Sequence, residues 1–218
     1  MAIALVQTAT LVNDNTSGST GQPKGVAIEH RSLANYLGWA QHTYGGEVPL
    51  SWPLFSSLAF DLTVTSLYVP LLSGGTVVVY EPRQEAGALT LSRIIADDGV
   101  DVMKVTPAHL ALLKDMDSRP RRLRTLIVGG EDLKGALAAE VTACLPGPIT
   151  IFNEYGPTEA TVGCMRHRFD PQHDSGGSVP IGTPIDNTQI YVLDAHHNPV
   201  PLGLPGALYI AGAGLARG

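Results

Sequence analysis

Asp101–Tyr155 reads DVMKVTPAHLALLKDMDSRPRRLRTLIVGGEDLKGALAAEVTACLPGPITIFNEY, in which short apolar runs alternate with segments of helical periodicity. The apolar runs, which are typical of buried strands, are Asp101–Val105, Thr125–Val128 and Ile149–Phe152. Helices are expected between them, at Pro107–Met116 and Lys134–Leu145. Regular alternation of strands and helices predicts an α/β fold in which helices flank a parallel sheet.

The same alternation continues towards the N-terminus and stops near Cys164. Further strands are expected at Val26–Ile28, Trp52–Ser56 and Thr76–Tyr80, and further helices at Arg31–Tyr44, Asp61–Leu72 and Thr90–Asp98. After Cys164, Gly, Pro, Asn and Asp become dense, and only Gln189–Leu193 and Ala207–Ala211 are strand-like. The pattern predicts a three-layer, flavodoxin-like subdomain over residues 1–164 and the start of a β-rich subdomain over residues 165–218.

The composition is that of a compact globular protein and excludes several functions. Of the 218 residues, 44% are hydrophobic and 16% are charged, with a formal net charge of −6. The only basic cluster, Arg119–Arg124, is local, which argues against nucleic-acid binding. Cys144 and Cys164 lack metal-ligand spacing, as expected for reduced thiols. Without a basic leader or an apolar stretch of ~20 residues, the sequence predicts a cytoplasmic protein with no membrane span.

A glycine-rich segment, Thr16–Gly25, reads TSGSTGQPKG. Glycines allow a backbone to turn its N–H groups towards one point, and the hydroxyls and Lys24 add donors, so the segment suits phosphate oxygens. Its spacing differs from that of the common P-loop. On composition alone, phosphate binding and a flexible linker are equally good interpretations.

The order of these residues is more specific than their composition, because it resembles the signature loop of the acyl-adenylate-forming (AMP-binding) enzymes. Three further segments resemble signatures of that superfamily: Phe60-Asp61, Asn153–Glu159 (NEYGPTE) and Leu208–Gly218 (LYIAGAGLARG). Together the four segments, which span essentially Val12–Gly218, resemble part of the adenylation domain of a nonribosomal peptide synthetase. Phe60-Asp61 favours this branch, because in it the Asp pairs with the α-ammonium group of an amino acid.

The resemblance implies ATP and Mg²⁺ as ligands. In the family the glycine-rich loop holds the triphosphate, a Tyr stacks on adenine, and a Thr-Glu pair handles phosphate and magnesium; here these are Tyr155, Thr158 and Glu159. The catalytic residues are then Thr158 and Glu159, with Glu159 on Mg²⁺. The implied nucleotide-binding residues are Thr16, Ser17, Gly18, Ser19, Thr20, Gly21, Lys24, Gly130, Asn153, Tyr155 and Gly156.

Independently of the family, the predicted sheet brings polar residues together. Ligands of parallel sheets bind at the carboxyl ends of the strands, where Lys104, Gly129, Gly130 and Glu154 are expected. Lys104 interrupts an otherwise apolar strand, which is costly unless the charge has a partner. Two interpretations remain open from the residues: Lys104 pairs with Glu154, or its side chain reaches solvent at the strand end.

Alignment with the family places the amino-acid pocket on Asp61, Leu62, Thr65, Lys104, Ile127, Gly129, Glu154, Val162 and Gly163. This combination resembles the one associated with L-asparagine activation. A carboxamide has an acceptor oxygen, to which Lys104 can donate, and an NH₂ group, from which Glu154 can accept. Thr65 adds a hydrogen bond, and the two glycines leave room. From the residues alone, Asp61 also suits the N-cap of the following helix.

The resemblance also implies neighbours: a peptidyl carrier domain with its phosphopantetheine, and a condensation domain. The family's domain extends beyond both ends of this sequence, so the 218 residues alone are expected not to turn over. Local departures are the polar Asn13-Asp14-Asn15, where the family has an apolar strand, and Ala207, where it has Glu. The alternatives are an acyl- or aryl-CoA synthetase, against which Asp61 argues, and a non-catalytic fragment that binds nucleotide or carrier.

Overall fold

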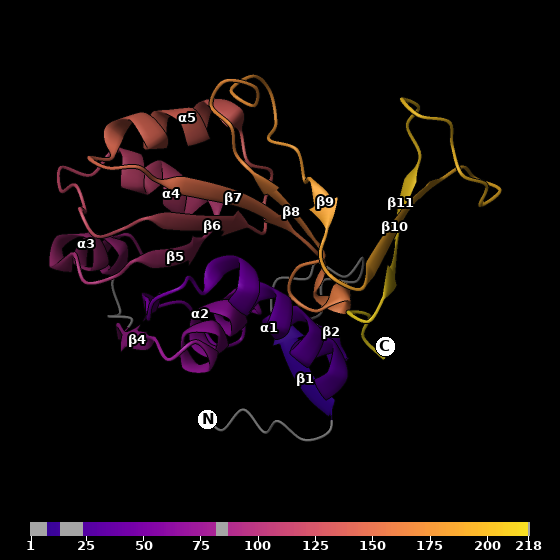
Figure 1. The fold of residues 1–218 in the computed structure, drawn as a ribbon, viewed down its shortest axis with the longest axis horizontal. Coiled ribbons are helices and arrows are strands. Elements are labelled where there is room, and N and C mark those ends of the chain that lie inside the picture. The colour runs from indigo at the N-terminus through magenta and orange to yellow at the C-terminus, as the bar shows by residue number, and fades with distance from the viewer. Residues whose placement is uncertain (1–7, 14–23, 82–86, 218) are drawn as a thin grey trace.

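The structure is a computed structural model that describes residues 8–13, 24–81 and 87–217. Its centre is a five-stranded sheet of order β5-β6-β7-β8-β9, with helices on both faces (Figure 1). The strands are β5 (Val102–Val105), β6 (Thr125–Gly129), β7 (Thr150–Tyr155), β8 (Met165–Arg168) and β9 (Thr183–Pro184). Strands β5, β6 and β7 are parallel, which confirms the predicted α/β class with a parallel sheet. Strands β8 and β9 are antiparallel additions that the sequence pattern did not reveal.

Two helical layers cover the sheet because its strands alternate their side chains between the faces. In β6, Leu126 and Val128 belong to the core beneath α3 (Gly87–Asp97), α4 (Pro107–Lys114) and α5 (Gly135–Cys144). Ile127, between them, belongs to the opposite core with α1 (His30–Tyr44) and α2 (Leu62–Leu72). Both cores are closed by apolar side chains, so every residue of β6 from Leu126 to Gly129 is buried.

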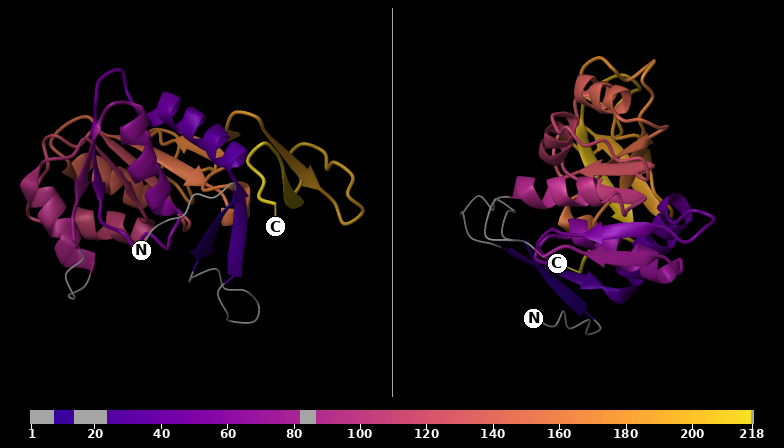
Figure 2. Two further views of the ribbon diagram at one scale, coloured as in Figure 1. Left: turned by 90° about the horizontal axis from the view of Figure 1, so that it is seen from below. Right: turned by 90° about the vertical axis from the view of Figure 1, so that its left-hand side faces the viewer.

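Three two-stranded sheets surround this centre (Figure 2). They are β1 (Thr8–Asn13) with β2 (Lys24–Glu29), β3 (Ser51–Leu54) with β4 (Thr76–Val79), and β10 (Thr188–Leu193) with β11 (Ala207–Gly212). The pair β3–β4 is parallel and the other two are antiparallel. Although Asn13 is polar, it still pairs with Lys24 at the end of β1.

The part of the chain after residue 164 divides into two. Strands β8 and β9 follow that position and yet hydrogen-bond into the central sheet, whereas β10 and β11 form a sheet of their own that extends away from it (Figure 1). The division into subdomains at residue 164 remains a prediction. Within the described ranges, none of the helices combines the length and the apolar character that a membrane span requires.

The start of α4 is fixed by a capping box directly after β5. The Thr106 hydroxyl accepts a hydrogen bond from the backbone N–H of His109, and the His109 ring accepts one from the backbone N–H of Thr106. Pro107 occupies the first helical position, where its missing N–H costs nothing. The cap thus turns the chain from strand to helix immediately beyond Lys104.

Replacing Thr106 by Ala is expected to lower the free energy of unfolding by about 1 kcal/mol, because an N-cap hydroxyl is lost. Thr142→Ala on α5 is the matched control. The Thr142 hydroxyl bonds back to the Ala138 carbonyl inside a helix, where Ala is intrinsically preferred, so no loss is expected. Chemical denaturation of both variants measures the difference, and equal effects would contradict the capping role.

Candidate functional site

The three parallel strands bring the predicted pocket residues to one edge of the sheet. Lys104 of β5 lies beside Ile127 of β6, and Gly129 of β6 lies beside Glu154 of β7. These positions are at or near the carboxyl ends of the strands, where ligands of parallel sheets bind. We call this region the carboxyl edge.

At the carboxyl edge Lys104 and Glu154 form a buried ion pair. Their side chains are 3% and 2% exposed, and the Lys104 ammonium contacts Glu154 Oε1 directly. Of the two interpretations of Lys104, pairing with Glu154 is therefore the one that the structure shows. Two charges removed from water are tolerated only when further hydrogen bonds satisfy them.

Three hydroxyls supply those hydrogen bonds. Lys104 Nζ donates to Thr65 Oγ1 at 2.9 Å and to the Tyr36 hydroxyl at 3.1 Å. The Tyr36 hydroxyl lies 3.1 Å from Glu154 Oε1 and 2.6 Å from Thr65 Oγ1, and the Tyr44 hydroxyl donates to Glu154 Oε2 at 2.8 Å. Tyr36 and Tyr44 were not among the predicted site residues. Helical spacing predicts that both face the core, but nothing in it indicates that their hydroxyls meet a charged pair.

Asp61 lies at the N-cap position of α2, but its side chain makes no capping hydrogen bond. It accepts one from the Thr158 hydroxyl instead, at 2.8 Å. Burial raises the pKa of Asp61 above its usual value, while the Thr158 hydrogen bond and the Lys104 charge act in the opposite direction. A partly desolvated carboxylate next to the predicted nucleotide segment is thus available to a cationic group.

The remaining predicted pocket residues lie around the ion pair, but the two glycines among them make room for Glu154 and not for a ligand. Ile127 and Val162 are buried in the core of α1 and α2, and Leu62 lines a small pocket together with Lys104. A Cβ on Gly163 would come within 2.7 Å of Glu154 Oε1, and one on Gly129 within 2.8 Å of the Glu154 carbonyl oxygen. The space left by both glycines is thus taken by Glu154. The small pocket has no room for a water molecule, so a ligand there requires side chains to move.

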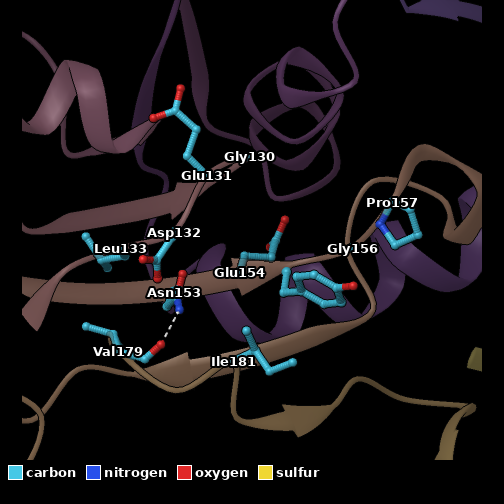
Figure 3. A pocket seen from close by; sticks show the side chains of 11 residues that line it. Gly130, Glu131, Asp132, Leu133, Asn153, Glu154, Gly156, Pro157, Val179 and Ile181 are labelled. Carbon is cyan, nitrogen blue, oxygen red and sulfur yellow. Dashed lines mark hydrogen bonds between the residues drawn. The ribbon is translucent and has the colours of Figure 1, made fainter. Parts of the chain in front are cut away.

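A larger pocket of about 440 Å³ lies on the other side of Glu154 (Figure 3). It contains four of the predicted nucleotide residues, Gly130, Asn153, Tyr155 and Gly156. The rest of its lining is Glu131, Asp132, Leu133, Glu154, Pro157, Val179 and Ile181. Because Lys104 lines the small pocket and Glu154 the large one, the two pockets approach each other at the ion pair.

Asn153 builds one wall of the large pocket. Its amide donates to the carbonyl oxygens of Val179 at 3.1 Å and Pro180 at 3.0 Å, which holds that segment beside β7. Asn153 and Glu154 point to opposite sides of the strand, as Figure 3 shows, because side chains alternate along β7. The contribution of Val179 and Ile181 could not be predicted, since nothing in the local sequence brings residues so far along the chain next to β7.

The segment that follows the pocket contains Thr158 and Glu159, the residues predicted to handle phosphate and magnesium. Thr158 and Glu159 begin a short 3₁₀ helix, Thr158–Ala160, in which Thr158 is buried and Glu159 is exposed. Within the described ranges, no three His, Cys, Asp or Glu side chains form a metal cluster. An exposed single carboxylate fits Mg²⁺, which commonly takes one or two carboxylates together with substrate phosphates. The predicted phosphate-binding residues Thr16, Ser17, Gly18, Ser19, Thr20 and Gly21 lie outside the described residues, and of Lys24 only the backbone is described.

The Thr158–Asp61 hydrogen bond makes a pH-dependent prediction. Since the folded-state pKa of Asp61 is raised, Asp61 lowers stability as the pH rises through that pKa, and the Thr158 hydroxyl limits the loss. Thr158→Val is expected to lower the free energy of unfolding by roughly 1.5–3 kcal/mol at pH 7, where the acceptor is charged. The loss should shrink on acidification. In an Asp61→Asn background the pH dependence of the Thr158→Val effect should disappear; if it persists, another carboxyl is responsible.

Comparison with known proteins identifies relatives of this site. The family described as AMP-binding enzyme matches residues 13–218. A protein of the mycosubtilin synthase of Bacillus subtilis is 52% identical over 204 residues, which are 93% of this chain and 8% of that protein. Bacitracin synthase 3 of Bacillus licheniformis is 49% identical over 203 residues, 93% of this chain and 3% of that protein. The chain therefore spans less than a tenth of either relative.

Solved structures of related proteins share the fold of this chain. A four-domain nonribosomal peptide synthetase bound to AMP and glycine superposes with a TM-score of 0.82 at 31% identity, covering 98% of this chain and 15% of that one. The N-terminal subdomain of NpsA from Klebsiella oxytoca, in complex with 3-hydroxybenzoyl-AMSN, superposes with a TM-score of 0.80 at 26% identity. That match covers 97% of this chain and 53% of the other.

Proposed function

Because the chain belongs to the AMP-binding enzyme family, we propose that it is the amino-acid-activating part of a nonribosomal peptide synthetase. In this reaction a carboxylate oxygen of the amino acid attacks the α-phosphorus of ATP. A new O–P bond forms, the bond to the pyrophosphate oxygen breaks, and aminoacyl-AMP and pyrophosphate result. Such a reaction depends on positioning and on charge stabilisation more than on covalent catalysis. The likeness to the four-domain peptide synthetase supports the proposal.

The large pocket beside β7 is the proposed site of the adenosine moiety. Its volume of about 440 Å³ falls in the range of small-molecule pockets. We assign Tyr155, whose side chain is partly exposed at the pocket, to stacking on adenine. The phosphates are assigned to Thr16–Gly25 and Thr158, and Glu159 would hold the Mg²⁺ that neutralises them. Binding of AMP by the four-domain neighbour supports this assignment.

Asp61 is the proposed ligand of the substrate's α-ammonium group. It is a half-buried carboxylate that does not cap its helix, and its hydrogen bond to Thr158 places it beside the proposed phosphate site. An ammonium group would supply an opposite charge that stabilises the ionised Asp61 carboxylate, which has lost part of its contact with water. This requirement distinguishes amino-acid activation from the alternative, an acyl- or aryl-CoA synthetase, whose substrates lack the α-amino group.

The observation that carries the substrate assignment is the buried Lys104–Glu154 pair. We propose L-asparagine, whose carboxamide would enter beside the pair, accept from Lys104 through its oxygen and donate to Glu154 through its NH₂. For Lys104 to donate, it would exchange one hydroxyl partner, Thr65 or Tyr36, for the carboxamide oxygen. This exchange replaces one neutral hydrogen-bond partner of Lys104 by another. Because the small pocket has no room for a water molecule, the side chains that line it would move apart when the carboxamide binds.

The product and the partners follow from the same assignment. Aminoacyl-AMP would pass to the phosphopantetheine thiol of a peptidyl carrier domain, and a condensation domain would use the loaded amino acid. Since the chain spans 8% and 3% of two relatives, we propose that it works inside a larger synthetase in the cytoplasm and does not turn over alone.

Amino-acid-dependent ATP–pyrophosphate exchange by the synthetase that contains this chain tests the proposal. Exchange driven by Asn well above Asp, Gln and Phe supports both the activity and the pocket assignment. Exchange driven by another amino acid would retain the activity and reject asparagine. No exchange with any amino acid, together with thioester formation from an acid lacking an amino group, would favour the CoA-synthetase alternative.

A further inference from the structure

The hydrogen bonds around Glu154 nearly exhaust what its carboxylate can accept. An ionised carboxylate offers about four acceptor positions. Three donors already use it: Lys104 and Tyr36 at Oε1, and Tyr44 at Oε2. One acceptor position therefore remains for a ligand, and a ligand can use it only by donating a hydrogen bond.

The hydrogen bonds of Lys104 leave no N–H donor free for a ligand. Its ammonium has three N–H donors, and Thr65, Tyr36 and Glu154 take all three. Any ligand oxygen would therefore find no free donor on Lys104 and would have to displace Thr65 or Tyr36. A carboxylate would in addition bring a second negative charge beside Glu154 and draw the ammonium away from it. Since Tyr36 contacts both members of the pair, it resists that separation.

Both tyrosines keep their protons at any working pH. Burial, with the nearby Glu154 charge, raises the pKa of Tyr36 and of Tyr44 well above the usual value. Both hydroxyls therefore remain donors. Their rings are buried and held as well, because the Trp39 ring packs against both, at centroid distances of 5.8 Å from Tyr36 and 5.3 Å from Tyr44.

We propose that Tyr36 and Tyr44 are specificity-determining positioning residues: their hydroxyls hold the Glu154 carboxylate so that its free acceptor position selects a carboxamide over a carboxylate. The inference rests on the proposed function, because it concerns the same amino-acid pocket. When one of the two hydroxyls is removed, Glu154 gains a second free acceptor position and its carboxylate can turn more freely. Loss of the Tyr36 hydroxyl also frees one N–H donor of Lys104, which becomes accessible to the carboxylate of aspartate, whereas loss of the Tyr44 hydroxyl acts through Glu154.

The test uses Tyr36→Phe and Tyr44→Phe in the complete synthetase, with exchange kinetics for Asn and for Asp. Each variant loses a hydrogen bond to a charged group, which corresponds to roughly a tenfold to hundredfold change in an equilibrium or rate. We expect the ratio of kcat/KM for Asn to that for Asp to fall by about this factor, mainly through a higher KM for Asn. If the tyrosines had a merely structural role, kcat/KM would change by the same factor for Asn and for Asp, and the ratio would stay unchanged.

Tyr80→Phe is the matched control. Tyr80 is also buried, its hydroxyl interacts with a carboxylate, Asp97, and it lies in the other core, under α3 to α5. Its loss should leave the Asn/Asp ratio unchanged. Thermal unfolding verifies that each variant is folded, and if one tyrosine variant does not fold, the other decides.

The outcomes separate the two proposals. Asn-driven exchange in the wild type with an unchanged ratio in the folded tyrosine variants overturns the inference alone. An equal fall of the ratio in Tyr80→Phe also overturns it. Exchange driven by an amino acid without a carboxamide overturns the substrate assignment and the inference together. A lowered ratio in both tyrosine variants and not in Tyr80→Phe supports the inference.

Discussion

Replacing Lys104 by methionine is expected to lower the free energy of unfolding by about 3–5 kcal/mol, the cost of leaving one buried charge without its partner. Methionine has a similar shape, so the loss is one of charge and hydrogen bonds. Glu154, which is 2% exposed, would keep only Tyr36 and Tyr44 as donors. Chemical denaturation at neutral pH measures the change.

The control for Lys104→Met is the double variant Lys104→Met with Glu154→Gln, which removes both charges. Replacing both members of a buried pair is generally much less costly than breaking it. The double variant should therefore be more stable than the sum of the two single effects predicts, with a coupling of at least ~1 kcal/mol. A cost of less than about 1 kcal/mol for Lys104→Met, or strict additivity, would contradict a buried ion pair.

Replacing Asp61 by asparagine is expected to lower kcat/KM for the amino acid by roughly 10²–10³-fold, as truncation of one partner of a buried charged contact does. The protein itself should not lose stability. Because burial raises the folded-state pKa of Asp61 above the unfolded value, the ionised side chain lowers stability as the pH rises through that pKa. Asn carries no such charge, so the variant should be at least as stable as the wild type at pH 7. Exchange kinetics and denaturation measure the two effects.

Asp194→Asn gives the opposite result and serves as the control for Asp61→Asn. Backbone N–H groups of Asn198 and His196 lower the pKa of the half-buried Asp194. Its contribution to stability is therefore present above the unfolded-state pKa and is lost as the pH falls. Asp194→Asn should lose some stability at neutral pH and keep full activity. Loss of activity in both variants would show that the effect of Asp61→Asn is not specific to the site.

The sequence pattern was sufficient for the parallel strands of the central sheet and for their helices, because the side chains there follow simple periods. Apolar runs predicted β5, β6 and β7, and residues at helical spacing predicted α1 and α5. Strands β8 and β9 were missed because β8 contains Arg166, His167 and Arg168, and β9 has only two residues. Such short antiparallel additions at the edge of a sheet lack a pattern of their own, and they depend on their neighbours, since β8 pairs with β7 and β9 with β8.

At the site, the sequence could identify residues next to signature segments, but not contacts between distant ones. Lys104 and Glu154 were predicted as possible partners because both were expected at the carboxyl ends of neighbouring parallel strands. The Thr158–Asp61 hydrogen bond joins residues 97 apart, and Tyr44 reaches Glu154 across 110. These contacts depend on how α1 and α2 pack on the sheet. Likewise, the space at Gly163 was predicted for the substrate, whereas the structure fills it with Glu154.

Competition among all twenty amino acids tests the central claim most directly. The synthetase that contains this chain is mixed with Mg-ATP and equal concentrations of the amino acids, and the adenylates formed are identified by mass spectrometry. The account predicts that asparaginyl-AMP dominates and that it disappears in Asp61→Asn. An adenylate of a different amino acid as the main product, or none at all from the folded synthetase, would contradict it.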